Sequence, residues 1–297
     1  MRVTTDPARR VPILTSFGVL MAALVAGPAW QSSLAQDTER PGLSIELIDP
    51  NVLRVCADPH NMPFSTERGE GFENKIADLV ARKLGKRIGY TWYPASTGFV
   101  RNTLGAYKCD VVMGMPQGGD LVQVTNPYYR TAYALVFKTG TELAGVDDLS
   151  DARLKDKHIG IVAGTPPGTS MVLNGLMANA KSYPLVVDTR IESSASAMIQ
   201  DLAKGEIDAG VLWGPMAGYH AGQASPPLTV VPLVKEKNGP RLAYYIGMGV
   251  RHADQEWKRT LNRTIQESQG EINNILLSFG VPLLDDKDRP LQNAPSK

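Results

Sequence analysis

The chain has 297 residues, of which 43% are hydrophobic and 21% are charged, and its 31 basic residues nearly balance 30 acidic ones. A chain of this length can bury a large core, either in two medium lobes or in one large domain. The charge balance leaves no basic surface of the kind that binds nucleic acid, so we expect no nucleic-acid partner.

The first 35 residues have the pattern of a signal peptide. Three arginines precede an apolar stretch at 17–26, and small residues stand at 33–35, where signal peptidase cleaves. The stretch is shorter than the roughly 18 residues that a spanning helix needs, and no later segment reaches that length. We therefore predict that residues 1–35 are removed during export, by the Sec rather than the twin-arginine route. The mature chain then has no membrane span, lies outside the cytoplasm and carries 28 basic and 29 acidic residues.

From residue 52 onward the predicted elements alternate between strand and helix. The first group, in chain order, is a strand at 52–57, a helix at 72–84, a strand at 88–92, a short helix at 99–107 and a strand at 109–113. A similar order follows in the second half, with a strand at 158–163, a helix at 169–180, a strand at 184–187, a helix at 194–203 and a strand at 207–213. Two such units predict an α/β fold with two lobes and a cleft between them.

Two β-rich segments, 133–138 and 241–250, fall outside these units, and we predict that they are strands that cross between the lobes. A final helix is expected to begin near Asp254, which can cap it, and Gly270 can divide that helix in two. Beyond Pro282 the chain becomes polar and contains further prolines, so we expect it to be poorly ordered.

Cys56 and Cys109 are the two cysteines of the chain. In an oxidising compartment an even pair favours a disulfide. The alternative is two small buried thiols in neighbouring strands. No histidine or cationic cluster lies near either residue in the sequence to lower a thiol pKa, so catalysis by cysteine is not expected.

Six short motifs together resemble the signature of the family 3 solute-binding proteins. They are Asn126-Pro127-Tyr128-Tyr129, the strand at 133–138, Asp147-Asp148-Leu149, Val162-Ala163-Gly164-Thr165, Gly205-Glu206-Ile207-Asp208-Ala209 and Ser278-Phe279-Gly280. The resemblance covers nearly the whole mature chain and implies the type II periplasmic-binding-protein fold, in which two hinge strands join two α/β lobes. It assigns residues 36–135 and 245–285 to lobe 1 and residues 136–244 to an inserted lobe 2, and it leaves 286–297 as a polar tail.

A second set of motifs resembles the MoxJ-like branch of that family, whose members are associated with quinoprotein dehydrogenases. The motifs lie at 54–59, 61–65, 69–77 and 98–104. This resemblance implies a periplasmic methanol dehydrogenase as partner, an enzyme that uses pyrroloquinoline quinone with calcium or a lanthanide. Quinone and metal would belong to the partner, and we expect no cofactor or metal on this chain.

The residues that bind amino acids elsewhere in the family are missing here. Family members hold the ligand's carboxylate with an arginine just after the Met-Gly-Met strand, and its amino group with an acid at the end of a lobe 2 strand. This chain has no arginine in Pro116–Asp120 and has Trp213-Gly214-Pro215 at the second place. Lys75 also stands where the family usually has an aspartate. We therefore do not expect amino-acid uptake.

The predicted cleft is apolar. Its candidate residues share positions at strand ends and in loops, and they are Phe64, Trp92, Met115, Tyr128 and Trp213. Phe64 and Trp92 can instead pack into the core, whereas Trp213 is the strongest cleft candidate. The loop at 164–170 follows a strand and opens a helix, so an anion can bind near Thr165 and Thr169. The alternative is that Thr169 or Ser170 only caps the helix.

The sequence favours a binding role over catalysis. The histidines have no metal-ligand spacing, and neither a nucleophile elbow nor a dinucleotide fingerprint occurs. A lyase or dehydratase derived from this fold would need Asp58, Glu73 or Asp120 as acid and base, but the sequence favours a solvated or turn-capping role for each. We therefore expect a non-enzymatic accessory that assists activation or maturation of the dehydrogenase. The alternative is the receptor of an ABC transporter for a small solute that is not an amino acid.

Overall fold

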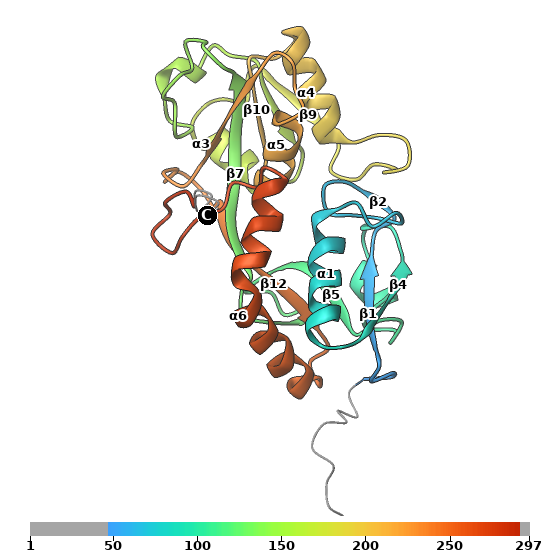
Figure 1. Ribbon diagram of the computed structural model, residues 1–297. Coiled ribbons are helices and arrows are strands. Elements are labelled where there is room, and N and C mark those ends of the chain that lie inside the picture. Colours follow the sequence, from blue (N-terminus) through green and yellow to red (C-terminus); the bar gives the residue numbers. More distant parts are fainter. Residues whose placement is uncertain (1–46, 292–297) are drawn as a thin grey trace, which may run out of the picture. The chain divides into compact units, whose positions relative to one another are not determined.

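The computed structural model describes residues 47–291, in which one ten-stranded sheet has two halves that meet at the long strand β7 (Tyr129–Lys138) (Figure 1). The main strand order is β4-β1-β5-β12-β7-β10-β8-β9. Off this order, β6 (Gln123–Val124) pairs with β12 and β11 (Leu228–Pro232) pairs with β7. We call the half up to β12 lobe 1 and the half from β10 onward lobe 2. The predicted signal peptide lies outside the described residues.

Lobe 1 is built on parallel strands with a returning antiparallel one. Strand β1 (Val52–Ala57) lies between β4 (Arg87–Trp92) and β5 (Val111–Pro116), and β12 (Ala243–Val250) runs antiparallel to β5. Helices α1 (Phe72–Lys83) and α6 (Gln255–Ser278) pack on one face of these strands, and the short α2 (Phe99–Asn102) lies toward the other. A small hairpin, β2 (His60–Asn61) and β3 (Ser65–Thr66), lies between β1 and α1 in the chain.

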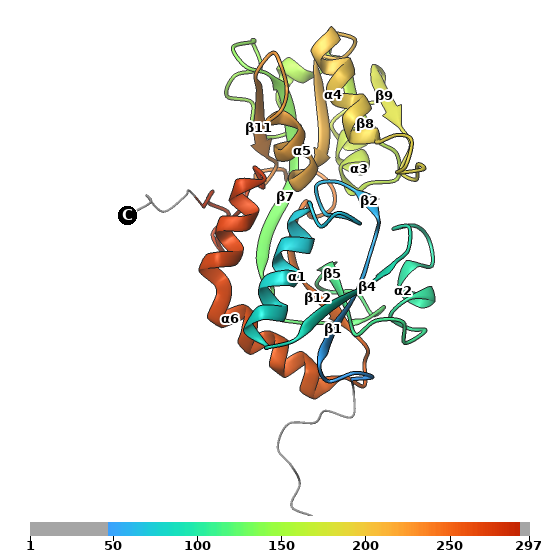
Figure 2. The same cartoon turned by 45° about the vertical axis from the view of Figure 1, so that its right-hand side comes forward.

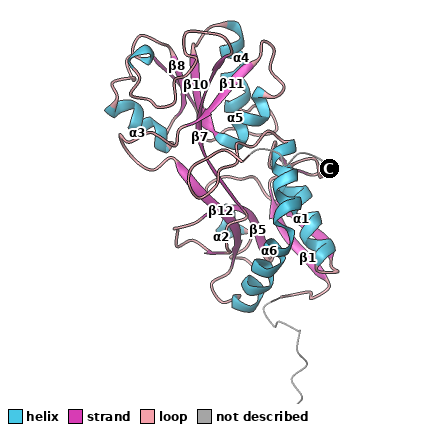
Figure 3. Ribbon diagram, turned by 60° about the vertical axis from the view of Figure 1, so that its left-hand side comes forward, coloured by secondary structure: helices cyan, strands magenta, loops and turns pink. Residues whose placement is uncertain are grey.

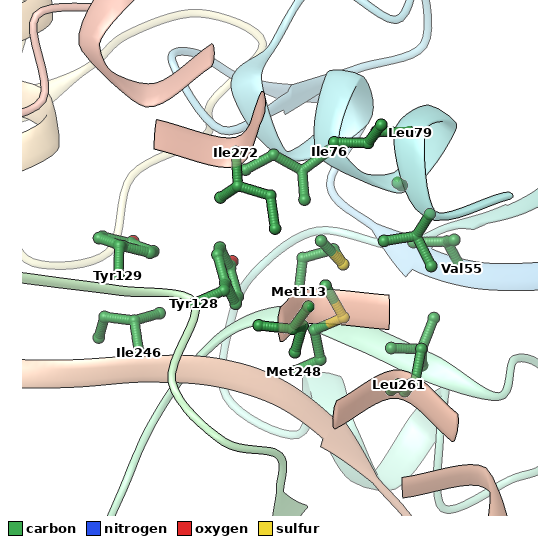
Figure 4. Close-up of a cluster of buried hydrophobic side chains, with 14 of the residues drawn as sticks. Val55, Ile76, Leu79, Met113, Tyr128, Tyr129, Ile246, Met248, Leu261 and Ile272 are labelled. Carbon is green, nitrogen blue, oxygen red and sulfur yellow. The ribbon is translucent and has the colours of Figure 1, made fainter. Parts of the chain in front are cut away.

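The core of lobe 1 follows from strand alternation. Val55 and Met113 point to the face covered by α1 and α6, where Figure 4 shows them with Met248 of β12. Their neighbours Cys56 and Val112 point to the opposite face, where α2 packs. Apolar side chains at helical spacing on α1 and α6 complete the first cluster. The apolar face of the strands, which repeats every two residues, therefore packs against the apolar faces of two helices, which repeat every 3.6 residues.

Lobe 2 has the same two-sided arrangement. Strand β10 (Ala209–Trp213) lies between β7 and β8 (Ile159–Val162), and β9 (Ala180–Tyr183) forms the edge. Helix α3 (Pro166–Leu173) contributes to the cluster on one face, while α4 (Ser194–Lys204) and α5 (Gly214–Ala221) pack on the other. Gly160 and Gly210 let Met198 of α4 approach the strands, because a β-carbon at either position would crowd its side chain.

Cys56 and Cys109 form a disulfide, with their α-carbons 5.5 Å apart. Both residues are buried. The disulfide ties the end of β1 to the residues before β5, so the structure contains the first of the two alternatives that the sequence allowed.

Several predicted boundaries were wrong for identifiable reasons. Helix α3 starts at Pro166 rather than at 169, because prolines fit the first turn of a helix, where no amide hydrogen is needed. A strand at 180–183 replaces the one predicted at 184–187, since Pro184 cannot donate a ladder hydrogen bond. The helix predicted at 99–107 ends at Asn102. Helix α6 continues through Gly270, where a buried apolar face outweighs the roughly 1 kcal/mol penalty of one glycine.

The segment after Pro282 is ordered up to Leu291, contrary to the prediction. Leu283 and Leu284 are buried, and Leu284 forms an isolated bridge with Pro290. The two leucines supply enough apolar contact to fix a segment that is otherwise polar.

A buried ion cluster next to the disulfide joins three elements of lobe 1. Asp110 is 1% exposed at its side chain and pairs with Arg54 Nε at 3.2 Å and with Arg251 Nη2 at 2.8 Å. Arg251 also donates to the carbonyl of Cys109 at 2.6 Å and pairs with Asp254 at the start of α6. One carboxylate therefore holds β1 and the end of β12 together.

Asp110→Ala is expected to lower the free energy of unfolding by about 3–5 kcal/mol, because two arginines would lose the buried charge that compensates them. Urea unfolding of the mature protein measures this change. Asp156→Ala removes an exposed aspartate and serves as the control, with an expected change within about 0.5 kcal/mol. Equal effects of the two substitutions would show that the cluster is not a stabilising element.

Candidate functional site

A cleft of about 1160 Å³ lies between the lobes. Lobe 1 contributes the hairpin around His60 and the β5 residues Gly114 and Pro116, while lobe 2 contributes the end of β10, helix α5 and the residues before α4. The loop at 184–193, which we call the lip loop, is drawn in yellow in Figure 1 and extends from lobe 2 toward β2. The crossing strands β7 and β12 supply the residues between these two walls, and Figure 3 shows β7 running from one lobe to the other.

Three aromatic rings from the crossing region line the cleft. Trp213 ends β10, and its ring packs edge-on against Tyr133 of β7 at 5.1 Å and against Tyr244 of β12 at 5.9 Å between centroids. Burial and the neighbouring Tyr244 raise the pKa of Tyr133 to about 12, and burial also raises the pKa of Tyr244. Both hydroxyls are therefore neutral at physiological pH. This cluster gives the cleft an aromatic floor that carries no charge.

The lip loop adds exposed aliphatic side chains to this floor. Leu185, Val186 and Ile191 are 58%, 64% and 81% exposed, and all three line the cleft. Met62 and Phe64 face the cleft from lobe 1. Apolar side chains thus line the cleft on both lobes, an arrangement typical of interaction sites.

Two charged groups of the lip loop, Asp188 and Arg190, neutralise each other, whereas the acidic side chain of Glu192 also lines the cleft. Arg190 donates to Asp188 at 2.6 Å, and this interaction lowers the pKa of Asp188 to about 2, with a smaller contribution from the charge of His60 across the cleft. His220 on α5 also lines the cleft, and burial lowers its pKa, which favours the neutral imidazole. Arg190 therefore lines the cleft as one half of an ion pair and not as a free guanidinium.

The helix start at Thr165 is a poor anion site. Thr165 is the N-cap of α3, but its hydroxyl donates to the carbonyl of Val162 at 2.6 Å. Pro166 and Pro167 occupy the first turn and bring no amide hydrogens to it. Thr169 lies inside the helix rather than at its start, and so does Ser170, so neither caps it. The anion-binding interpretation of this loop therefore loses its donors.

The structure brings some of the predicted cleft residues together and separates others. Phe64, Thr165 and Trp213 line the cleft, and Phe64 also packs on the core residue Phe72 with ring centroids 5.2 Å apart. Tyr128 lies in the core, where its hydroxyl accepts a hydrogen bond from the Gly114 amide at 3.1 Å.

Trp92, Met115 and Thr169 are not among the cleft-lining residues. Trp92 stacks on Tyr90 at 4.5 Å along the edge strand β4. Met115 points to the opposite face of β5 from Met113 and packs beside the disulfide cluster. Lys75 is exposed on α1 and does not line the cleft, so it does not change the chemistry there as the sequence had indicated.

The three carboxylates that were candidates for catalysis have different surroundings. Asp58 accepts hydrogen bonds from the amides of His60 and Ala95 and so caps a turn. Asp120 is exposed. Glu73 is half-buried on α1, and its carboxyl lies where a β-carbon of Gly114 would be. Burial raises the pKa of Glu73 to about 8.

Sequence reasoning missed the lip loop and the polar side of α5. The apolar run Leu185-Val186-Val187 predicts a strand, although an apolar run directly after Pro184 also fits an exposed binding loop. The predicted elements did not include helix α5, on which Tyr219 and His220 reach the cleft. The Pro at its first turn was the signal that could have revealed this helix.

Residues 53–279 match the model of the bacterial extracellular solute-binding proteins, family 3. The chain belongs to this family. Its two-lobed α/β fold is the periplasmic-binding-protein fold that the sequence predicted, and the resemblance to the MoxJ-like branch is confirmed by the following relatives.

The chain is 29% identical over 295 residues to Protein MoxJ of Methylorubrum extorquens, which covers 93% of this chain and 95% of the relative. The crystal structure of the periplasmic binding protein XoxJ from Methylobacterium extorquens AM1 is 42% identical, with a TM-score of 0.68, over 79% of this chain and 100% of that one. The crystal structure of MxaJ from Methlophaga aminisulfidivorans MPT is 25% identical, with a TM-score of 0.67, over 78% and 100% of the two chains.

The region from 47 to 291 contains no helix that is both long and apolar enough to cross a membrane. Within the same region, no group of three histidine, cysteine, aspartate or glutamate side chains is placed to hold a metal ion.

Glu73→Gln is expected to flatten the pH dependence of stability. Because the folded-state pKa is raised, the folded protein binds a proton that the unfolded chain has lost, and this group's contribution to the free energy of unfolding falls from about pH 5 to about pH 8. The slope is at most about 1.4 kcal/mol per pH unit. The glutamine variant stays neutral and lacks this decline, so its free energy of unfolding should rise relative to that of wild type as the pH increases. Urea unfolding across this range tests the expectation, with the exposed Glu67→Gln as control; parallel curves for Glu73→Gln and wild type would contradict it.

Proposed function

We propose that this chain is a periplasmic accessory protein of a quinoprotein methanol or alcohol dehydrogenase, and that it assists activation or maturation of that enzyme by holding one of its segments in the cleft. The MoxJ-like relatives support the class of partner. Pyrroloquinoline quinone and its calcium or lanthanide ion would be bound by the dehydrogenase. The observation that carries the proposal is the composition of the cleft.

The cleft suits an uncharged ligand that is larger than a single metabolite. Its volume of about 1160 Å³ lies above the roughly 300–1,000 Å³ of most small-molecule pockets. The guanidinium of Arg190, which lines the cleft, is already paired with Asp188. A free amino acid would bring a carboxylate into a site that offers no free guanidinium clamp, and burying an unpaired charge is unfavourable.

An extended, apolar polypeptide segment matches these features. Side chains of the segment would cover Val186 and Ile191 of the lip loop and the aromatic floor at Trp213, at about 25 cal/mol per Å² of apolar area buried. Side chains with amide or hydroxyl groups, Gln200, Gln223 and Ser196 among them, also line the cleft and can bind main-chain groups of the segment. An immature dehydrogenase, whose segments are not yet packed, offers such a ligand.

A second candidate function is that of a solute receptor for an ABC transporter. Membership of the solute-binding family and the position of the cleft between two lobes favour it. A receptor of this kind would be stabilised by a small neutral metabolite and would not bind the dehydrogenase. The identity of the ligand, a small metabolite or a segment of the dehydrogenase, therefore distinguishes the two functions.

Val186→Asp and Ile191→Asp are expected to weaken binding of the cofactor-free dehydrogenase about tenfold or more, because each places a charge in an apolar contact. Trp213→Ala should reduce both binding and stimulation of the enzyme. Biolayer interferometry measures binding, and the rate at which the dehydrogenase gains activity measures stimulation.

Leu121→Asp provides a matched control for Val186→Asp. Leu121 is also 64% exposed but lies in lobe 1 outside the cleft lining, so its substitution should leave binding unchanged. The proposal fails if the cleft variants bind and stimulate as well as wild type. Thermal stabilisation by a small metabolite, with no dehydrogenase binding, would select the receptor function instead.

A further inference from the structure

The end of α6 contacts lobe 2, although the helix itself packs in lobe 1. Gly280 follows α6, and its carbonyl lies against Gly218 of α5 so closely that a β-carbon at Gly218 would overlap it. The ring of Phe279 stacks on Tyr219 of α5 with centroids 6.2 Å apart. Figures 2 and 3 both show this end of α6 beside α5. The two lobes therefore also touch through backbone outside the crossing strands themselves.

The residues after Gly280 continue this contact across β7 and β12. The hydroxyl of Thr131 donates to the Pro282 carbonyl at 2.8 Å, and the Leu284 amide donates to the Arg130 carbonyl at 2.9 Å. Leu284 also packs with Ala132 of β7 and Ala243 of β12. The segment is thus bound to both crossing strands at the point where they pair with each other.

A buried arginine fixes the far end of the segment. The guanidinium of Arg130 donates to the Asp285 carbonyl at 3.1 Å and forms an ion pair with Asp288. The Arg130 side chain is 5% exposed, and its guanidinium also lies 5.0 Å from the ring centre of Tyr245, whose hydroxyl donates to Asp286 at 3.2 Å. A desolvated, charge-assisted contact of this kind holds one geometry.

We propose that residues 279–291 act as a hinge brace, which holds the lobes at the angle seen in the structure and prevents the cleft from closing by hinge bending. Bending of two crossing strands changes the backbone angles of a few residues. The brace lies on these residues and also ties α6 to α5, so bending has to break its contacts.

The contact between α5 and Gly280 explains why a glycine stands at position 218 inside a helix. Glycine is less favourable than alanine inside a helix, yet Gly218 stands within α5, at the closest approach of the two backbones. By contrast, Gly270 in α6 has nothing within 4 Å of a β-carbon position. The two positions therefore give a matched pair of substitutions. Gly218→Ala must separate α5 from the end of α6, whereas Gly270→Ala leaves that contact unchanged.

Spin labels on each lobe test the brace independently of the proposed function. Glu67 in lobe 1 and Lys204 in lobe 2 are exposed and can be replaced by cysteine for labelling, since Cys56 and Cys109 are joined in a buried disulfide. Pulsed electron–electron double resonance then gives the distribution of distances between the two spin labels, one on each lobe. Wild type and Gly270→Ala are expected to give the same single narrow distribution. Gly218→Ala and Asp288→Asn should each broaden it and add a second distance.

Asp288→Asn keeps the proposal falsifiable if Gly218→Ala does not fold. Asp288 has a positive φ of 63°, which asparagine tolerates, and its side chain is 43% exposed, so this substitution removes the charge with little other change. Circular dichroism establishes that each variant is folded. An unchanged distribution in folded Asp288→Asn, or a wild type that already shows two distances, would overturn the brace.

Discussion

The pairing of β7 with β12 determines most of what the cleft is. Residues Tyr129–Ala132 of β7 pair with β12, and the following residues of the same strand pair with β10 and β11 in lobe 2. Tyr133 stands where one set of pairs ends and the other begins, opposite Trp213. The hydrogen bonds that join the lobes therefore also place the aromatic floor. A shift of register by one residue would turn these rings away and disrupt the cores of both lobes, since alternate residues face opposite sides of a sheet.

Internal neutralisation of charge gives this cleft its character. The family fold places a cleft between two lobes, and in this chain the arginine that lines that cleft is paired before any ligand arrives. Arg190 is bound to Asp188, and burial favours the neutral forms of Tyr133 and His220. Selection in such a site depends on shape, apolar area and hydrogen bonds to neutral groups. An anionic ligand would lose its hydration without gaining a free counter-charge.

Sequence periodicity predicted the elements whose burial is regular. The strand at 52–57 and the helix from Phe72 repeat apolar residues at the spacing that their packing requires, and the structure has both. The family and its two-lobed fold followed from motifs in their order. Features that depend on tertiary contacts were not predictable in this way. Leu283 and Leu284 occur in a polar context, and their burial depends on a groove beside β7 and β12 that no local pattern reveals.

The cleft residues were predicted only in part for a related reason. A position at a strand end shows that a side chain can face the cleft, but not that it does so. Trp213 and Phe64 face it, whereas Tyr128 turns into the core, where the Gly114 amide and the apolar side chains of α6 surround it (Figure 4). The direction of each side chain depends on the pairing register of its strand. That register is set by residues far away in the sequence.

The proposed brace and the apolar surfaces of the cleft favour the same kind of ligand. A receptor that closes can surround a small solute and gain contact area from both lobes. A cleft whose walls are held apart gains area from both lobes only when the ligand is long enough to span them. The lip loop and the aromatic floor provide separate apolar surfaces for such a ligand. Because fixed walls need no ordering on binding, the conformational entropy that is lost is that of the flexible segment, which supplies the adaptability that the protein lacks.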